Sequence, residues 1–358
     1  MSEGPTGSLV LIGVGLVGAS IALAASRDGW QVHLRDRNTS HALVAAGLGA
    51  GTLEEPDPAA VDLVVVAVPP DNCAQVISAA LTEFPGATVT DVASVKGALV
   101  HQLRDLVSPE AASRHIGSHP MAGSHRSGPA AADADLFVDR TWVITPSPTA
   151  PPDRVATVRA LAELCGASVV QMAADDHDRA VAAVSHLPHL ASVLVASQLN
   201  EVPSDHLGLS GQGLRDVTRV AGGDPALWVQ ILSSNADAVR PRLQQLRDGA
   251  DRLLTELDDR GTLTARLTSG VDGTRRIPGK HGRAGRVWDE VVVEIPDSPG
   301  ALARLFADVA ATEVNIEDMA IEHDPVREVG FLALSIDSEH ALGLRDVLDA
   351  AGWVVRPG

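Results

Sequence analysis

The chain has 358 residues, which is enough for two or three domains with separate hydrophobic cores. Its formal net charge of −18 argues against nucleic acid and anionic membranes as partners, because both attract basic surfaces. Two cysteines, an N-terminus without a basic leader, and apolar runs well short of the roughly 18 residues that span a bilayer predict a cytoplasmic protein.

The first predicted strand leads into a glycine-rich turn with G-x-G-x-x-G spacing at Gly13, Gly15 and Gly18. Gly13 permits a tight turn from strand to helix, and Gly15 lets a pyrophosphate approach the backbone. Gly18 allows the helix to pack closely on the strand, and the helix N-terminus faces the phosphates. A second apolar run ends at Asp36, where a carboxylate can accept hydrogen bonds from ribose hydroxyls.

This β-α-β pattern predicts a dinucleotide cofactor, and its details favour NAD. Asp36 would repel the 2′-phosphate of NADP, although Arg35 and Arg37 on either side of it leave NADP as the alternative. Leu16 and Val17 lie inside the glycine turn and are predicted cofactor contacts together with the three glycines.

Residues 1–172 form the predicted dinucleotide-binding domain. Its apolar runs are continuous rather than alternating, which predicts strands buried on both faces of a parallel, doubly wound Rossmann-type α/β sheet. The strands are expected at residues 9–12, 32–34, 61–68, 88–90, 116, 142–145 and 168–171. Ligands of such sheets lie beyond the carboxyl ends of the strands, so Val68 and Pro69 are predicted to border the cofactor.

The character of the sequence changes near residue 173. Residues 173–268 have apolar positions at spacings of three and four, which predicts a second, all-α domain. Residues 269–286 are rich in glycine and arginine and lack periodicity, so we expect a linker there. Residues 287–358 predict strands and helices in the order β-α-β-β-α-β, which is the order of a ferredoxin-like module.

The first strand-to-helix turn of this last module contains Asp297, Pro299, Gly300 and Ala301. It resembles the ligand loop of the ACT domain, a regulatory module that binds amino acids at strand–helix junctions and paired interfaces. The resemblance implies an effector site at these four residues. A module that serves dimerisation alone is the alternative.

Four further segments combine polar side chains in patterned surroundings. They are DVASVKG (91–97) with Ser94, HPMAGSHRSG (119–128) with His119, SHLPH (185–189) with His186 and His189, and RDVTRVAGGDPALW (215–228) with Arg219. Taken singly, each has an ordinary structural explanation. A histidine pair spaced as H-x-x-H without a third ligand is a poor zinc site, so we predict no metal.

Taken together and in this order, these motifs resemble the prephenate dehydrogenase family of tyrosine biosynthesis, over nearly the whole chain. The resemblance implies an NAD-dependent oxidative decarboxylation of prephenate to 4-hydroxyphenylpyruvate by a homodimer that pairs through the helical domain. It also implies that the ACT-like module binds an amino acid, with tyrosine as the expected effector. Arogenate dehydrogenase, which produces tyrosine directly, is the alternative activity.

The resemblance assigns roles to individual residues. His119 matches the family's catalytic base, which accepts the proton of the ring hydroxyl, and Ser94 is placed beside that hydroxyl and the nicotinamide. Arg219 matches the arginine that binds a substrate carboxylate, and His189 matches a substrate-binding histidine. A guanidinium suits a carboxylate because the two groups can form parallel hydrogen bonds.

The loop after His119 departs from the family pattern. Many relatives have an acidic residue at the position of His125, whereas this chain has a histidine next to Ser124. Ser124 and His125 are predicted substrate contacts. The missing acid removes a partner for the ammonium group of arogenate and therefore favours prephenate slightly.

Two rival functions fit the sequence less well. A 3-phosphoglycerate-type dehydrogenase also combines a dinucleotide fold with an ACT module, but its cofactor fold interrupts the catalytic domain instead of preceding it. A non-catalytic sensor of NAD and an amino acid would have no need for His119, Ser94 and Arg219 together.

Overall fold

The computed structural model describes residues 7–122, 127–277, 288–296, 298–312, 314–324 and 329–357. The chain forms two compact units, of which the first ends at Asp251 and the second begins at Arg252. This division falls inside one long helix, so most of the predicted helical domain belongs to the same unit as the first sheet. The predicted domain boundaries therefore stay predictions.

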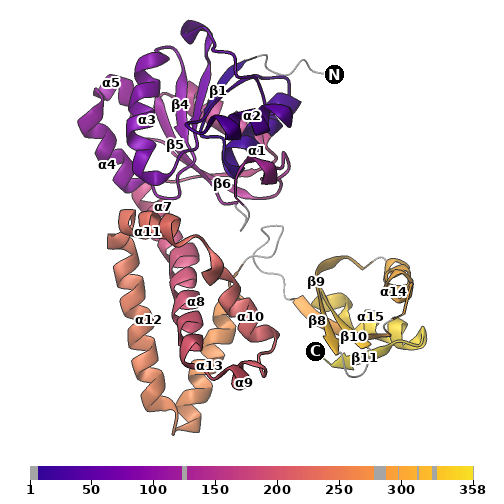
Figure 1. Cartoon of the computed structure of the whole chain (residues 1–358). Helices are drawn as coiled ribbons and strands as arrows, with labels where there is room; N and C mark the ends of the chain where they lie inside the picture. The colour runs from indigo at the N-terminus through magenta and orange to yellow at the C-terminus, as the bar shows by residue number, and fades with distance from the viewer. Residues whose placement is uncertain are drawn as a thin grey trace. The chain divides into compact units, whose positions relative to one another are not determined.

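The first unit begins with a seven-stranded sheet and its helices (Figure 1). In chain order these are β1 (Ser8–Ile12), α1 (Leu16–Arg27), β2 (Gln31–Arg35), α2 (Thr39–Gly47), β3 (Leu63–Val66), α3 (Pro70–Glu83), β4 (Thr88–Asp91), α4 (Gly97–Leu106), α5 (Pro109–Ala112), β5 (His115–Pro120), β6 (Thr141–Thr145), α6 (Pro152–Leu164) and β7 (Ser168–Gln171). Short 3₁₀ turns lie at η1 (Pro58–Ala60) and η2 (Pro129–Ala131).

The strands lie in the order β2-β1-β3-β4-β5-β6-β7. All neighbours are parallel except β5 and β6, which pair antiparallel. The prediction of an all-parallel sheet is therefore wrong at this point. Between these two strands, the described residues contain only the short 3₁₀ turn η2 and no crossover helix, and strands joined in that way pair antiparallel.

Helices cover both faces of this sheet, as the continuous apolar runs predict. Leu9 and Leu11 of β1 belong to a core that also contains residues of α1 and α6, whereas Val10 faces a second core shared with α3 and α4. Figure 1 shows α3 and α4 on one side of the sheet and α1 and α2 on the other. Because β1, β3, β4 and β5 are neighbours that run parallel, their carboxyl ends lie side by side along one edge of the sheet.

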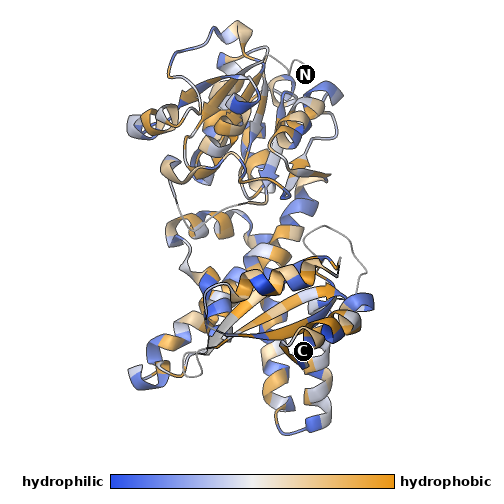
Figure 2. Ribbon diagram, turned by 90° about the vertical axis from the view of Figure 1, so that its right-hand side faces the viewer, coloured by the Kyte–Doolittle hydropathy of each residue, from blue (hydrophilic) through white to orange (hydrophobic). Residues whose placement is uncertain are grey.

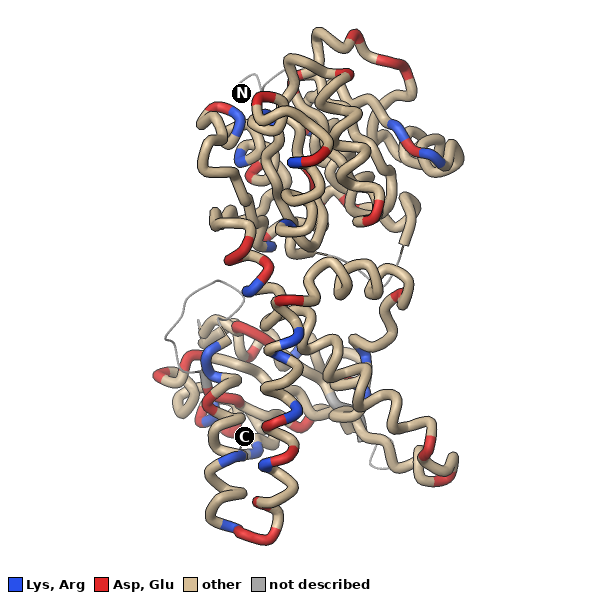
Figure 3. The backbone as a smooth tube through the Cα atoms, turned by 90° about the vertical axis from the view of Figure 1, so that its left-hand side faces the viewer, with Lys and Arg blue, Asp and Glu red and all other residues tan. Residues whose placement is uncertain are grey.

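The chain continues as helices that extend into the second unit. They are α7 (Ala174–Val181), the π-helical turn η3 (Ala182–His186), α8 (Leu187–Gln198), η4 (Leu199–Glu201), α9 (Ser204–Leu207), α10 (Gln212–Arg219), η5 (Val220–Gly222), α11 (Pro225–Ser234), α12 (Ala236–Glu256) and α13 (Arg260–Thr274). Helix α13 continues to Thr274, so the first residues of the predicted linker are helical. Figure 3 shows acidic and basic residues interspersed along these helices.

A π-helical turn interrupts the helical run between α7 and α8. Pro188 follows this turn; it has no N–H group, and its ring clashes with the carbonyl four residues earlier in a regular helix. The stretch Ala174–Glu201, which includes this turn, has 28 residues, and an 18-residue window of it has a mean hydropathy of 1.5, which is the length and hydropathy of a membrane-crossing helix. That resemblance is weak evidence for a membrane span, because Asp178 and His177 in the same stretch are buried inside the protein.

The second unit contains a four-stranded antiparallel sheet in the order β11-β8-β10-β9. Its elements are β8 (Trp288–Pro296), α14 (Ala301–Ala310), β9 (Ile316–Asp324), β10 (Val329–Asp337), α15 (Ser338–Ala350) and β11 (Val354–Pro357). This is the predicted β-α-β-β-α-β order. Alternate residues of β10 are buried, since Leu332 and Leu334 pack with Leu305 and Leu348 of the helices. Figure 2 shows the hydrophobic character of these strands.

Candidate active site

The glycine turn after β1 fits a dinucleotide pyrophosphate. Gly13 has φ +98°, and a Cβ atom there would lie 2.5 Å from the carbonyl oxygen of Ala67. A Cβ atom on Gly18 would lie 2.1 Å from the carbonyl oxygen of Gly13, whereas one on Gly15 would meet nothing within 4 Å. The space beside Gly15 is therefore open to a ligand. Helix α1 has neither a side-chain cap nor an acidic first turn, which leaves its N–H groups available to phosphate oxygens.

The carboxylate of Asp36 lies directly beside this turn. Its two oxygens accept hydrogen bonds from the backbone N–H groups of Val14 at 2.6 Å and Asn38 at 2.7 Å. Arg35 forms ion pairs with Glu55 and, at 2.9 Å, with Glu83. Because Arg35 is held in these pairs, it does not offset the repulsion between Asp36 and a 2′-phosphate, which supports the preference for NAD.

The shared edge of the sheet brings most of the predicted cofactor and catalytic residues together. Val68 and Pro69 follow β3, Ser94 lies in the loop after β4, and His119 is the penultimate residue of β5. Since these strands neighbour one another and run parallel, the four residues lie along the same edge as the glycine turn. In the described part of the chain, the hydroxyl of Ser94 has no hydrogen-bond partner.

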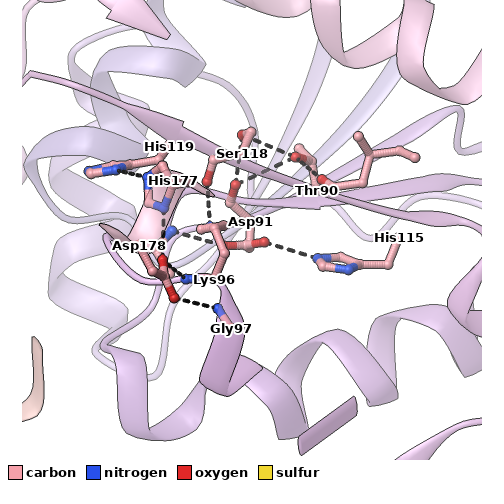
Figure 4. A network of polar contacts seen from close by, with 11 residues as sticks. Thr90, Asp91, Lys96, Gly97, His115, Ser118, His119, His177 and Asp178 are labelled. Atoms are coloured by element: carbon pink, nitrogen blue, oxygen red, sulfur yellow. Dashed lines mark hydrogen bonds and ion pairs between the residues drawn. The ribbon is translucent and has the colours of Figure 1, made fainter. Parts of the chain in front are cut away.

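His119 is the first member of a chain of polar contacts (Figure 4). Its Nδ1 lies 2.9 Å from Nε2 of His177, and Nδ1 of His177 lies 2.8 Å from Oδ1 of Asp178. The carboxylate of Asp178 also accepts hydrogen bonds from the backbone N–H groups of Lys96 at 2.9 Å and Gly97 at 2.7 Å. A side chain from α7 thus caps the N-terminus of α4 and contacts the predicted base through one intervening imidazole.

A second buried network lies beneath His119 (Figure 4). Lys96 is only 1% exposed. Its ammonium forms an ion pair with Asp91 and donates a hydrogen bond to the carbonyl oxygen of Ser118 at 2.5 Å. His115 Nε2 lies 2.9 Å from the other oxygen of Asp91. Burial alone would raise the pKa of Asp91, but Lys96 and His115 overcome that effect and hold it at about 2. The network fixes the backbone immediately before His119.

The surroundings of His119 favour its neutral form. Burial, followed by the nearby charge of Lys96 and the neighbouring His177, lowers the pKa of His119 well below its usual value. His186 is also buried, and burial lowers its pKa to about 4. Its Nδ1 lies 3.2 Å from the side-chain amide of Asn235. An unprotonated imidazole at the carboxyl edge of the sheet is suited to accept a proton.

His189 and Arg219 belong to a second group of site residues. The imidazole of His189 stacks on the indole of Trp228. Burial lowers the pKa of His189, and the nearby backbone of Val220, the residue after Arg219, partly offsets that effect. Nδ1 of His189 is buried without a hydrogen-bond partner, so a polar group of a ligand could satisfy it. Arg219 is exposed, and among the described residues no carboxylate forms an ion pair with it.

The structure therefore places the predicted site residues in two groups. One comprises the glycine turn, Asp36, Ser94 and His119; the other comprises His189 and Arg219. No hydrogen bond or ion pair joins the two groups within the described residues. Ser124 and His125 lie outside the described residues, as does Asp297 of the predicted effector loop.

Sequence reasoning missed several residues of this site. His177, Asp178, Asp91 and His115 were not candidates, and Trp228 was not recognised as the stacking partner of His189. The pair Asp178 and Lys96 is separated by 82 positions, so no local pattern signals the contact. In the described part of the chain, no cluster of three or more histidine, cysteine, aspartate or glutamate residues could hold a metal ion.

Comparison with known families matches most of the chain. The model "Prephenate dehydrogenase, nucleotide-binding domain" matches residues 21–171, and "Prephenate dehydrogenase, dimerization domain" matches residues 173–266. A probable prephenate dehydrogenase, NovF of Streptomyces niveus, is 35% identical over 359 residues, covering 96% of this chain and 98% of the relative.

Solved structures give the same relationship. The structure of prephenate dehydrogenase from A. aeolicus in complex with hydroxyphenyl propionate and NAD+ is 25% identical, with a TM-score of 0.68 over 76% of this chain and 99% of that one. The Synechocystis arogenate dehydrogenase is 30% identical, with a TM-score of 0.64 over 75% of this chain and 98% of that one. These matches and the geometry of the site together show that the chain belongs to the prephenate dehydrogenase family.

Proposed function

We propose that this protein catalyses the NAD-dependent oxidative decarboxylation of prephenate to 4-hydroxyphenylpyruvate in tyrosine biosynthesis. Membership of the prephenate dehydrogenase family supports this activity. The observation that carries the assignment is the position of His119, a neutral imidazole on the same sheet edge as the glycine turn. An assay that follows NADH formation from prephenate tests it directly.

The chemistry requires a base beside the hydroxyl-bearing carbon of the ring. Bound NAD supplies an acceptor for the hydride that leaves this carbon. As the C–H bond breaks, His119 takes the hydroxyl proton and the carbon–oxygen bond becomes a carbonyl. The ring carboxylate then leaves as CO2, its bonding electrons make the ring aromatic, and the phenolate oxygen recovers the proton from His119.

Ser94 is proposed to hold the reacting hydroxyl. It lies in the loop after β4, the strand next to that of His119, and its own hydroxyl has no partner among the described residues. A hydrogen bond from Ser94 would orient the substrate oxygen towards the imidazole. Orientation of this kind lowers the barrier because the reacting atoms are already close when the reaction begins.

The two substrate carboxylates require cations or hydrogen-bond donors. We assign one carboxylate to Arg219, whose guanidinium is free of carboxylate partners among the described residues, and a polar substrate group to Nδ1 of His189. Ser124 and His125 are proposed as further substrate contacts from the sequence pattern alone. Since no hydrogen bond or ion pair joins the two groups of site residues within the described part of the chain, we propose that the bound substrate spans them.

Arogenate is the second candidate substrate, because an arogenate dehydrogenase is among the similar structures. Arogenate differs from prephenate by an amine in place of the side-chain keto group. The histidine at position 125 offers no negative charge to this amine, which favours prephenate. Parallel assays with the two substrates separate the candidates, and activity with neither would leave a sensor of NAD and an amino acid.

The C-terminal sheet is proposed to be an ACT-like regulatory module of the ferredoxin-like type. Its first strand–helix turn borders a cavity of about 320 Å³ whose lining includes Ser298, Gly300, Ala301, Leu302 and Ile321. This volume suits an amino acid, and we assign it to tyrosine as a feedback inhibitor. Pro299 is predicted at this site but is not among the lining residues that the structure gives, and Asp297 lies outside the described residues.

A homodimer in the cytoplasm is the proposed working form. The family model that matches residues 173–266 describes a dimerisation domain. These helices expose apolar side chains such as Leu194, which is 50% exposed, and Val229, which is 64% exposed. Exposed apolar surface of this extent is typical of an interface. Sedimentation of the purified protein tests the assembly state.

A further inference from the structure

Two residues that no sequence pattern singles out lie behind the proposed base. We propose that His177 and Asp178 are positioning residues that fix the tautomer of His119, so that its Nε2 carries the lone pair that accepts the substrate proton. This inference rests on the proposed function for its role in catalysis, but the tautomer itself can be measured without substrate.

The argument begins at Asp178. Two of its hydrogen bonds come from the backbone N–H groups of Lys96 and Gly97, which can only donate. A carboxylate with these partners is ionised and carries no proton of its own. The third contact, at 2.8 Å from Nδ1 of His177, therefore requires that nitrogen to be the donor.

The protonation of His177 then determines that of His119. With Nδ1 protonated, a neutral His177 has only Nε2 as an acceptor, and this atom lies 2.9 Å from Nδ1 of His119. Nδ1 of His119 must therefore donate. Its remaining nitrogen, Nε2, is left with the lone pair and is the atom available to the substrate.

Burial makes this arrangement stable. His177 is 1% exposed and Asp178 is 7% exposed, so water does not compete effectively for their hydrogen bonds. The rings of His119 and His177 meet edge to face, with centroids 5.1 Å apart and planes at 75°. Asp178 is itself held by the N-terminus of α4, which ties the orientation of His119 to two elements of the fold.

The same contacts assist the proton transfer. When His119 accepts the substrate proton, both of its nitrogens carry hydrogen, and the bond from Nδ1 to His177 becomes charge-assisted. The negative charge of Asp178, one imidazole further away, favours the imidazolium that forms. The ammonium of Lys96 lowers the pKa of His119 and the carboxylate of Asp91 raises it, so these two charges act on His119 with opposite sign.

A matched pair of substitutions at position 177 tests the positioning role. His177→Gln places an amide where Nε2 lay and keeps an acceptor for His119. His177→Asn places its amide near the former Nδ1, so it keeps the contact with Asp178 and loses the contact with His119. We expect His177→Asn to lower kcat by roughly 10- to 100-fold with KM changed less than about threefold, and His177→Gln to retain most of kcat.

Equal loss in the two variants, or equal retention of wild-type kcat, would overturn the proposal. His33→Gln is the control, because His33 of β2 is also a buried histidine with one hydrogen-bonded ring nitrogen but does not contact His119. This control should lower the thermal midpoint without the kcat loss of His177→Asn. Thermal melting of every variant shows whether the chain is folded.

Nitrogen NMR of the histidine-labelled protein reads the tautomer directly, and the His119→Asn spectrum assigns the His119 signals. We expect the Nδ1-protonated tautomer in the wild-type protein near neutral pH and a mixture of both tautomers in His177→Asn. A wild-type His119 protonated on Nε2 would refute the inference. This measurement needs no turnover, so its failure is distinct from a failure to oxidise prephenate.

Discussion

The imidazole of His189 lies flat against the indole of Trp228, with ring centroids 3.5 Å apart and 7° between the ring planes. The indole holds this ring in one orientation while its Nδ1 remains unpartnered. A group fixed in this way binds a ligand with less loss of side-chain freedom than a mobile one. The packing of Trp228 against His189 should therefore strengthen substrate binding.

Loss of the stacking ring should raise KM for the substrate more than it lowers kcat. Trp228→Leu is expected to raise KM for prephenate roughly tenfold with a smaller change in kcat, because His189 loses its fixed orientation. Trp228→Phe keeps an aromatic face and is the control, with KM close to that of the wild type. Steady-state kinetics measure both, and an unchanged KM in Trp228→Leu would contradict the assignment of His189.

Arg219 should act on binding through its charge. Arg219→Gln removes a charge-assisted hydrogen bond worth about 1.5–3 kcal/mol, so KM for prephenate should rise roughly 10- to 100-fold. Arg215, one turn earlier on α10 and also exposed, provides the control as Arg215→Gln. Similar KM values for both variants would show that another cation binds the carboxylate.

The cofactor preference should depend on Asp36. Asp36→Ala removes the carboxylate that repels a 2′-phosphate, so kcat/KM with NAD should fall while that with NADP rises. Arg37→Ala, beside it and exposed, serves as the control and should alter the ratio for NAD over NADP much less. The ratio of kcat/KM for the two cofactors is the quantity to measure. A ratio unaffected by Asp36→Ala would place the ribose elsewhere.

Acid should destabilise the fold through buried histidines. The folded-state pKa of His186 is about 4, below the ordinary value of 6.5, so the unfolded chain binds more protons between these values. The stability that neutral His186 contributes is therefore fully present above about pH 6.5 and is lost as the pH falls towards 4. Between pH 7 and pH 5 the loss from this group is about 2 kcal/mol.

Denaturant unfolding at both pH values measures that loss. His186→Asn removes the titrating group, so the difference between the two pH values should shrink. His206→Asn is the control, because His206 is exposed and its substitution should leave the difference unchanged. A pH dependence identical in all three proteins would show that His186 does not contribute.

Regulation by tyrosine should depend on the cavity beside α14. Ile321→Trp fills part of this cavity and should abolish inhibition by tyrosine while leaving kcat without tyrosine unchanged. Val354→Trp, exposed on β11 and not among the cavity residues, provides the control. Inhibition that persists in Ile321→Trp would indicate that tyrosine acts at the active site instead.

The sequence predicts most accurately those structural features that depend on a short segment of the chain. The turn at Gly13 and Gly18 follows from local backbone needs, and its spacing is visible in the chain itself. Strand β5 is harder to predict, because its polar residues His115, Ser118 and His119 interrupt the apolar run and leave only one position of it recognisable. They are polar because they form the buried networks described above, which only the folded chain reveals.

Contacts between distant segments are beyond such reasoning. His119 and His177 are 58 positions apart, and their pairing depends on how α7 meets the end of β5. The predicted linker overlaps α13 for a related reason. Gly270 and Gly273 suggest an irregular segment, but each destabilises a helix by only about 1 kcal/mol, and α13 continues through both.

The most direct test of this account is the kinetics of His119→Asn with prephenate and NAD. The substitution removes the proton acceptor but leaves the carboxylate-binding residues intact, so kcat should fall about 10²-fold or more while KM changes less than about threefold. His101→Asn, on an exposed position of α4, should behave like the wild type. A His119→Asn enzyme with wild-type kcat would contradict the central claim that this imidazole takes the proton.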